Sequence, residues 1–224
     1  MSTEPCGSGV AGTGPTHGRP SALVDNDPVD GTSIRQSARS SATFLNGTLD
    51  LDWDRPIPDM TWSVREVVAH IGDTLLWYAT DLAGGPDELS TMDLRVRPSD
   101  DPGQLVATVI VFGSVLAHVV DGVTPGQRGF HPDGLADSTG FAAMACDEIL
   151  VHTRDAALGL GLDYRPSEVL SGAVLRRLFP WAPQDQETWD ALLWANGRVA
   201  LPGHPRQVGW HRHSAPLPES EGRG

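Results

Sequence analysis

The chain of 224 residues contains no lysine, and all 16 of its basic residues are arginine. Without lysine, no side chain can attach pyridoxal phosphate as a Schiff base or serve as the lysine of a phosphate-binding P-loop. Basic residues are also few beside the 29 acidic ones, which gives a formal net charge of −13 and a pI of about 4.8. Because such a charge repels polyphosphate and anionic lipid, the composition predicts neither a nucleic-acid partner nor a membrane partner.

Cysteine is scarce as well. The two cysteines, Cys6 and Cys146, lie far apart in the sequence, and no CxxC pair is present. We therefore expect neither a disulfide framework nor a metal site built from paired cysteines.

Neither a signal peptide nor a membrane span is expected. Residues 1–20 are rich in Gly and poor in apolar residues, which is not the pattern of a signal peptide. The longest apolar run, Leu105–Val120, contains His118 and is shorter than the roughly 20 residues that a membrane span needs. This run is typical of a buried helix, and the sequence as a whole predicts a cytoplasmic protein.

The rest of the chain is organised by helical periodicity. Residues 1–31 show no apolar period and are rich in Gly, Ser, Thr, Pro and Asp, which predicts a disordered tail. Apolar residues at helical spacing, bounded by capping residues and by Gly or Pro, then predict helices over residues 32–49, 61–82, 101–123, 140–158, 166–179 and 185–201. No strand series is present, so we predict an all-α fold with a four-helix bundle over residues 32–184. Residues 185–224 should form a C-terminal helical extension, a helix and a tail packed on the bundle.

The fourth predicted helix carries an unusual pair, Glu148 and His152. At about 100° per residue the two lie ~40° apart, on one face of the helix. They share this sector with Phe141, Met144, Ala145 and Asp155. Because an unpaired carboxylate buried among apolar atoms would cost several kcal/mol, Glu148 needs a cation, a metal or a set of donors. The i, i+4 spacing lets both side chains reach one ion, and it equally suits an ordinary intrahelical pair.

His70, on the second predicted helix, is the candidate for a third ligand. It lies about 100° from the centre of the apolar stripe of that helix, at the border where two helices meet. Two imidazoles and one carboxylate would leave a coordination position open, which is the pattern of catalytic rather than structural zinc sites.

Other residues of ligand type are interpreted as structural. His118 has no partner of ligand type at i, i+4, and the segment His211–His213 is expected to be solvated. Cys146 lies ~160° around the helix from Glu148, so the two cannot bind the same ion, and we expect a buried thiol.

Three segments together resemble a known family. They are Thr61–His70 with its Trp-x7-His element, Glu148–Ala156 with Glu-x3-His-x2-Asp, and Arg177–Trp181. Over about residues 33–215 the chain resembles the DinB-like superfamily, and within it the mycothiol-dependent maleylpyruvate isomerases. The resemblance implies a four-helix bundle that holds a divalent metal, usually zinc, at positions that match His70, Glu148 and His152.

The resemblance also implies an activity. The co-substrate would be a low-molecular-weight thiol, mycothiol, whose thiolate adds to a small electrophile and gives cis–trans isomerisation or S-transfer. Glu148 and Arg198 are the implied catalytic residues, since Asn196-Gly197-Arg198 is similar to the surroundings of a family arginine near the chain end. Arg198 could meet a substrate carboxylate or form a surface salt bridge. Unlike the isomerase, the chain is expected to have no full second domain, and to act as a monomer or homodimer.

Two other functions fit the same residues. One is a non-catalytic metal-binding stress or scaffold bundle, and the other is a metal-dependent hydrolase. A hydrolase is disfavoured because no GxSxG or HExxH motif occurs, although a metal-bound water could still attack an ester. An enzyme should have a cleft that leads to the metal past the loop at residues 128–137, whereas a scaffold should bury its ion or expose an apolar patch.

Overall fold

The computed structural model describes residues 28–89, 91 and 93–217, and this part of the chain is helical, with isolated β-bridges but no strand. The helices are α1 (Gly31–Asn46), α2 (Val64–Gly84), α3 (Pro102–Gly122), α4 (Ser138–Leu160), α5 (Glu168–Leu178) and α6 (Thr188–Ala195). The all-α fold predicted from the periodicity is therefore confirmed. Residues 1–27 of the predicted tail lie outside the described residues.

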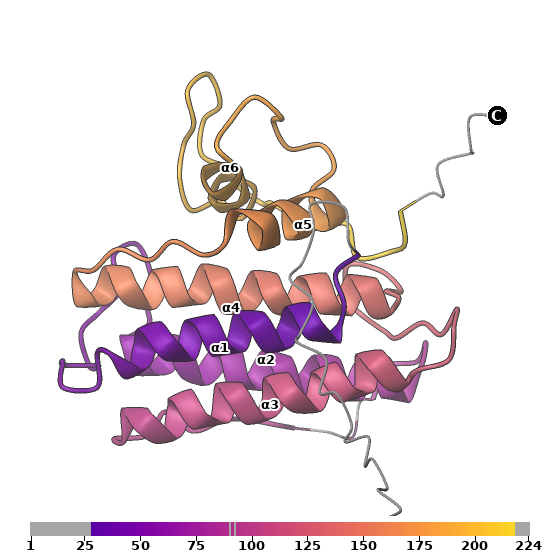
Figure 1. The fold of residues 1–224 in the computed structure, drawn as a ribbon, viewed down its shortest axis with the longest axis horizontal. Coiled ribbons are helices and arrows are strands. Elements are labelled where there is room, and N and C mark those ends of the chain that lie inside the picture. The colour runs from indigo at the N-terminus through magenta and orange to yellow at the C-terminus, as the bar shows by residue number, and fades with distance from the viewer. Residues whose placement is uncertain (1–27, 90, 92, 218–224) are drawn as a thin grey trace, which may run out of the picture.

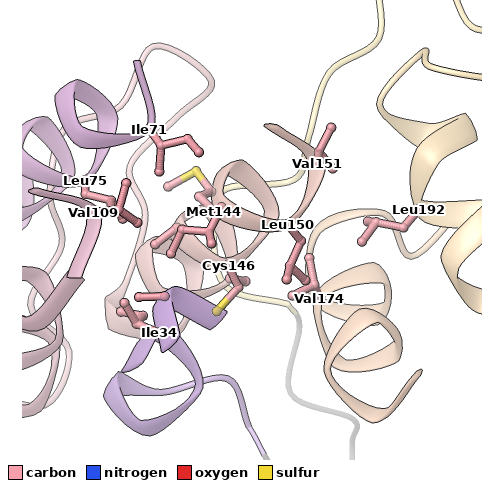
Figure 2. Packing of buried hydrophobic residues seen from close by; sticks show 14 of the residues in the cluster. Ile34, Ile71, Leu75, Val109, Met144, Cys146, Leu150, Val151, Val174 and Leu192 are labelled. Atoms are coloured by element: carbon pink, nitrogen blue, oxygen red, sulfur yellow. The ribbon is translucent and has the colours of Figure 1, made fainter. Parts of the chain in front are cut away.

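Helices α1 to α4 lie side by side as a bundle, α5 packs on α4 on the side away from α3, and α6 packs on α5 (Figure 1). Helix α4 is therefore packed on both sides. Figure 2 shows Met144 on the side that faces Leu75 and Val109, and Leu150 on the side that faces Val174 of α5. Nearly every residue of α4 from Gly140 onward is buried as a result.

The beginnings of α1 and α2 differ from the prediction. Asp30 caps α1 by accepting a hydrogen bond from the Ser33 amide, so the helix begins at Gly31, one residue before the predicted start at residue 32. Helix α2 begins at Val64 and not near Thr61, because Ser63 and Glu66 form its capping box. Both differences follow from local capping chemistry, which favours Asp and Ser at the position before the first helical turn.

The last helix is shorter than predicted. It ends at Ala195 instead of residue 201, because Gly197 has a φ of 66°, in the left-handed region. The first helix likewise ends at Asn46, with Gly47 as its C-cap, and not at Leu49.

Helix α3 is long and apolar enough, by length and composition, to cross a membrane. A core helix passes the same test, so this alone is weak evidence. Leu105, Val109 and Leu116 are buried, and α3 packs against α1 and α2 in the bundle (Figure 1). The packing agrees with the buried helix predicted from the sequence.

Candidate metal site and the cleft beside it

Three side chains converge between α2 and α4. His70 extends from α2, and Glu148 and His152 extend from α4 one turn apart. Glu148 Oε2 lies 3.1 Å from His152 Nε2 and 3.9 Å from His70 Nε2. One ligand atom from each of the three residues lies within 4.8 Å of the others. The structure thus brings together the three residues that the sequence predicts as ligands.

Asp155 orients the imidazole of His152. Its Nδ1 lies 3.1 Å from Asp155 Oδ2, which leaves Nε2 facing Glu148 and His70. Arg198 in turn donates from Nη2 to Asp155 Oδ2 at 2.9 Å and from Nη1 to the Asn196 carbonyl at 3.0 Å. Of the two roles considered for Arg198, the structure shows a salt bridge, although its partner Asp155 is buried rather than at the surface.

Arg212 is the residue that the sequence analysis missed. The segment His211–His213 was expected to be solvated, and this is wrong for Arg212, whose side chain is only 9% exposed. Arg212 Nη2 donates to Glu148 Oε1 at 2.8 Å, and Nη1 donates to the Tyr78 hydroxyl at 3.3 Å. The cation that the buried Glu148 requires is therefore a residue of the C-terminal segment.

The C-terminal segment is anchored close to Arg212. The His213 amide donates to the Leu178 carbonyl at 2.8 Å, and Ser214 Oγ donates to the Asp133 carbonyl at 3.0 Å. Arg177 of α5 donates to the carbonyls of His213 and Ser214 and also to Asp137, the N-cap of α4. These bonds hold the segment against both the bundle and the 129–136 loop.

The electrostatics of the site follow from this pairing. Burial would raise the pKa of Glu148, but Arg212 and His152 outweigh it and hold the pKa well below its ordinary value. Burial would lower the pKa of His152, whereas hydrogen bonds to Asp155 and Glu148 raise it to about 9. At His70, burial and the neighbouring His152 lower the pKa, so this imidazole is neutral at pH 7. Neighbouring residues thus stabilise the charged forms of Glu148 and His152 even without an ion.

The donor set fits a divalent transition metal. Two imidazoles and a carboxylate are ligands that Zn²⁺ accepts, and the Asp155–His152 hydrogen bond is the outer-shell support that such ligands commonly have. Arg212 occupies Oε1 of Glu148 and leaves Oε2 on the side of the two imidazoles. A metal here would therefore be bound by one oxygen of Glu148.

Three cavities reach these residues, and one of them, of about 550 Å³, is lined by Trp62, Trp77 and Val96 and reaches the candidate ligands only at His70. A cavity of about 270 Å³ is bounded by Trp62, the three candidate ligands, Arg198 and Arg212. Another cleft, of about 340 Å³, reaches His70 and Glu148 and is bounded by Phe130, His131 and Pro132. The loop that was expected to border an access cleft does so.

The other residues of ligand type lie away from the site. His118 is exposed on α3, with Nδ1 at 2.6 Å from the Ser114 carbonyl. Cys146 is fully buried, and burial raises the pKa of its thiol to about 12, as expected for a structural cysteine. His211 is exposed, as predicted.

Fold and donor set together define a helical bundle with a candidate metal site between its second and fourth helices. The profile of the mycothiol maleylpyruvate isomerase N-terminal domain matches residues 34–157, more than half of the chain. The chain therefore belongs to this DinB-like family, as the sequence motifs indicated. No curated protein and no solved structure gives a significant match. Membership supports a mycothiol-related, isomerase-like function.

Proposed function

We propose that the chain is a cytoplasmic, metal-dependent enzyme that activates a mycothiol-like thiol for cis–trans isomerisation of a small electrophile or for transfer to it. The observation that carries the proposal is the convergence of His70, Glu148 and His152 at a place where two cavities share His70 and Glu148 as lining residues. A scaffold protein would have no need of a metal site that two cavities reach, so this arrangement favours an enzyme.

In this proposal His70, Glu148 and His152 hold the metal. A bound divalent metal lowers the pKa of a thiol, so that a thiolate forms at neutral pH. Asp155 and Arg198 act as positioning residues, because they fix the orientation of the His152 ring. Arg212 holds Oε1 of Glu148 and balances its charge.

The reaction then needs a group that stabilises the negative charge that develops on the electrophile. When a thiolate adds to an activated double bond, a carbon–sulfur bond forms and the π electrons move to the carbonyl oxygen. Rotation about the resulting single bond and the reverse electron flow expel the thiolate and give the isomer. Arg212 lines the cavity of about 270 Å³ and carries a positive charge, which would stabilise that oxygen.

Metal content and thiol-dependent turnover test the proposal together. Purified protein should contain about one divalent transition metal per chain, and His70→Ala should lose most of it. His118→Ala is the matched control, because His118 is exposed on α3 and lies outside the site. Glu148→Gln should remain folded by circular dichroism but lose metal or turnover.

Two results would refute the proposal. One is full metal content in His70→Ala, which would remove His70 from the site. The other is a Glu148→Gln protein with unchanged metal affinity and unchanged turnover, which is what a simple intrahelical pair would give.

A further inference from the structure

The cleft beside the candidate metal site has an aromatic wall and an acidic rim. Its apolar lining comprises Trp77 and Tyr78 of α2 together with Leu89, Phe130 and Pro132 from two loops. Asp81 and Glu88 provide carboxylates on the same lining, which ends at His70 and Glu148. We call this space of about 340 Å³ the α2 cleft.

The loop that forms one wall is fixed against α2. The Phe130 amide donates to the Gly85 carbonyl at 2.8 Å, and Gly129 and Ala136 exchange two backbone hydrogen bonds. Gly129 approaches α2 so closely that a Cβ at this position would lie 2.7 Å from the Asp81 carbonyl oxygen. The cleft is therefore bounded by an ordered wall rather than by a loosely attached loop.

Neither carboxylate of the cleft has a cationic partner. In the part of the chain that the structure describes, no side-chain hydrogen bond or ion pair joins Asp81 or Glu88 to another residue. Burial, together with the neighbouring Glu88, raises the pKa of Asp81 to about 6. Asp81 is thus half-buried beside a like charge, an arrangement that destabilises the protein unless something compensates it.

The groups nearest to these carboxylates cannot supply the missing positive charge. Among the described residues, His70 lies against Glu148 and His131 lies against Asp133, and neither forms an ion pair with Asp81 or Glu88. No arginine lines the α2 cleft, and Arg212 on the far side is already paired with Glu148. A cationic ligand would complement the charge of these two carboxylates.

We propose that the α2 cleft binds an apolar or aromatic molecule that carries a protonated amine or a quaternary ammonium group. The apolar part would pack on Trp77, Tyr78 and Phe130, and the cation would lie between Asp81 and Glu88. Aromatic faces attract such cations further, whereas a dicarboxylate would meet two like charges. The assignment rests on the proposed function for the reaction that such a molecule would undergo, because the cleft leads to the candidate metal ligands.

Binding can be measured apart from catalysis with three probes of similar shape. These are 2-phenylethylammonium, the neutral 2-phenylethanol and the anionic 3-phenylpropanoate, titrated calorimetrically into the full chain as purified and after metal chelation. We expect the ammonium to bind at least about tenfold more tightly than the alcohol in both preparations, and the carboxylate to bind the metal-free protein most weakly. The chelated sample matters because a carboxylate could also bind a metal.

Variants of the two carboxylates test whether the preference for the ammonium probe arises in the α2 cleft. Asp81→Asn with Glu88→Gln should reduce the preference for the ammonium to less than about threefold, with an unchanged circular dichroism spectrum. Glu88→Gln alone, at an exposed position, should lose part of it. Asp87→Asn removes the same charge from an exposed residue outside the lining and should leave the preference intact.

Several outcomes would overturn the inference. One is that no probe binds, and another is that 3-phenylpropanoate binds the metal-free protein as tightly as the ammonium or more tightly. A third is that the double variant keeps the preference for the ammonium, and a fourth is that Asp87→Asn also abolishes this preference. The thiol-dependent activity is read separately. If turnover and metal content fail while the ammonium preference holds, only the proposed function falls, and the opposite pattern removes only this inference.

Discussion

The bundle and the C-terminal segment contribute opposite charges to the site. The second and fourth helices provide the imidazoles and the carboxylates of Glu148 and Asp155, whereas residues 196–214 provide the guanidinium groups of Arg198 and Arg212. The bundle alone would hold three buried carboxylates, those of Asp147, Glu148 and Asp155, with too few cations. The difference shows that the donors are set by helix geometry, and that their charge balance depends on a segment without regular structure.

The largest effect is expected when the guanidinium that balances Glu148 is removed. Arg212→Ala leaves Glu148 buried without its cation and should lower the free energy of unfolding by about 3–5 kcal/mol, a fall in Tm of roughly 6–20 °C. Urea unfolding of metal-free protein measures this. Arg165→Ala is the control, because its pairs with Asp163 and Asp190 are exposed, and it should cost no more than about 1 kcal/mol. Equal losses in the two variants would show that Arg212 is no more important than a surface ion pair.

A second test weakens the support behind His152. Asp155→Asn keeps the size of the side chain but removes the charge that orients the imidazole and pairs with Arg198. Metal affinity should fall by about 10–100-fold with the fold retained, as is usual for outer-shell partners. Competition with a chromophoric chelator measures this affinity. Unchanged affinity would mean that the orientation of His152 does not depend on Asp155.

The smallest effect is expected where the segment is anchored, at the pair of Asp137 and Arg177. Burial opposes ionisation of Asp137, but hydrogen bonds from Gly140 and Arg177 outweigh it and lower the pKa. A carboxylate whose pKa is lower in the folded than in the unfolded state stabilises the fold at pH values above the unfolded-state pKa of about 3.9. This stabilisation is lost as the pH falls through the folded-state pKa. Asp137→Asn keeps a capping side chain, so it should cost only about 1 kcal/mol at pH 7, because solvent partly screens the carboxylate.

Urea unfolding at pH 7, 4 and 3 follows this pair. The difference between wild type and Asp137→Asn should shrink as the pH falls. A difference that stays constant down to pH 3 would exclude the ionised carboxylate as its source.

The sequence predicted those parts of the molecule that depend on the helical periodicity of apolar residues. Apolar spacing located six helices, and the i, i+4 relation placed Glu148 and His152 on one face. His70 could be proposed from its border position, although its distance from Glu148 depends on how α2 and α4 pack. The end of α6 was misplaced because one glycine in the left-handed region outweighed the apolar pattern.

Helical periodicity could not identify Arg212 as a site residue, because its segment forms no helix. A chemical signal was available, however. A buried carboxylate needs a cation, and in a chain without lysine only an arginine can supply a permanent one. Which of the 16 arginines reaches Glu148 depends on backbone contacts such as the one from His213 to Leu178, and these have no signature in sequence. The missing partner of Asp81 was equally invisible, because an absence of contacts is a property of the folded chain.

The position of Arg212, 64 residues after Glu148, has a consequence for how the protein is made. At a synthesis rate of about 5–20 residues per second, Glu148 leaves the ribosome roughly 3–13 s before its cation does. During that interval a fully closed bundle would bury an unbalanced carboxylate. We therefore expect the nascent helices to keep Glu148 in contact with water until the C-terminal segment has been added.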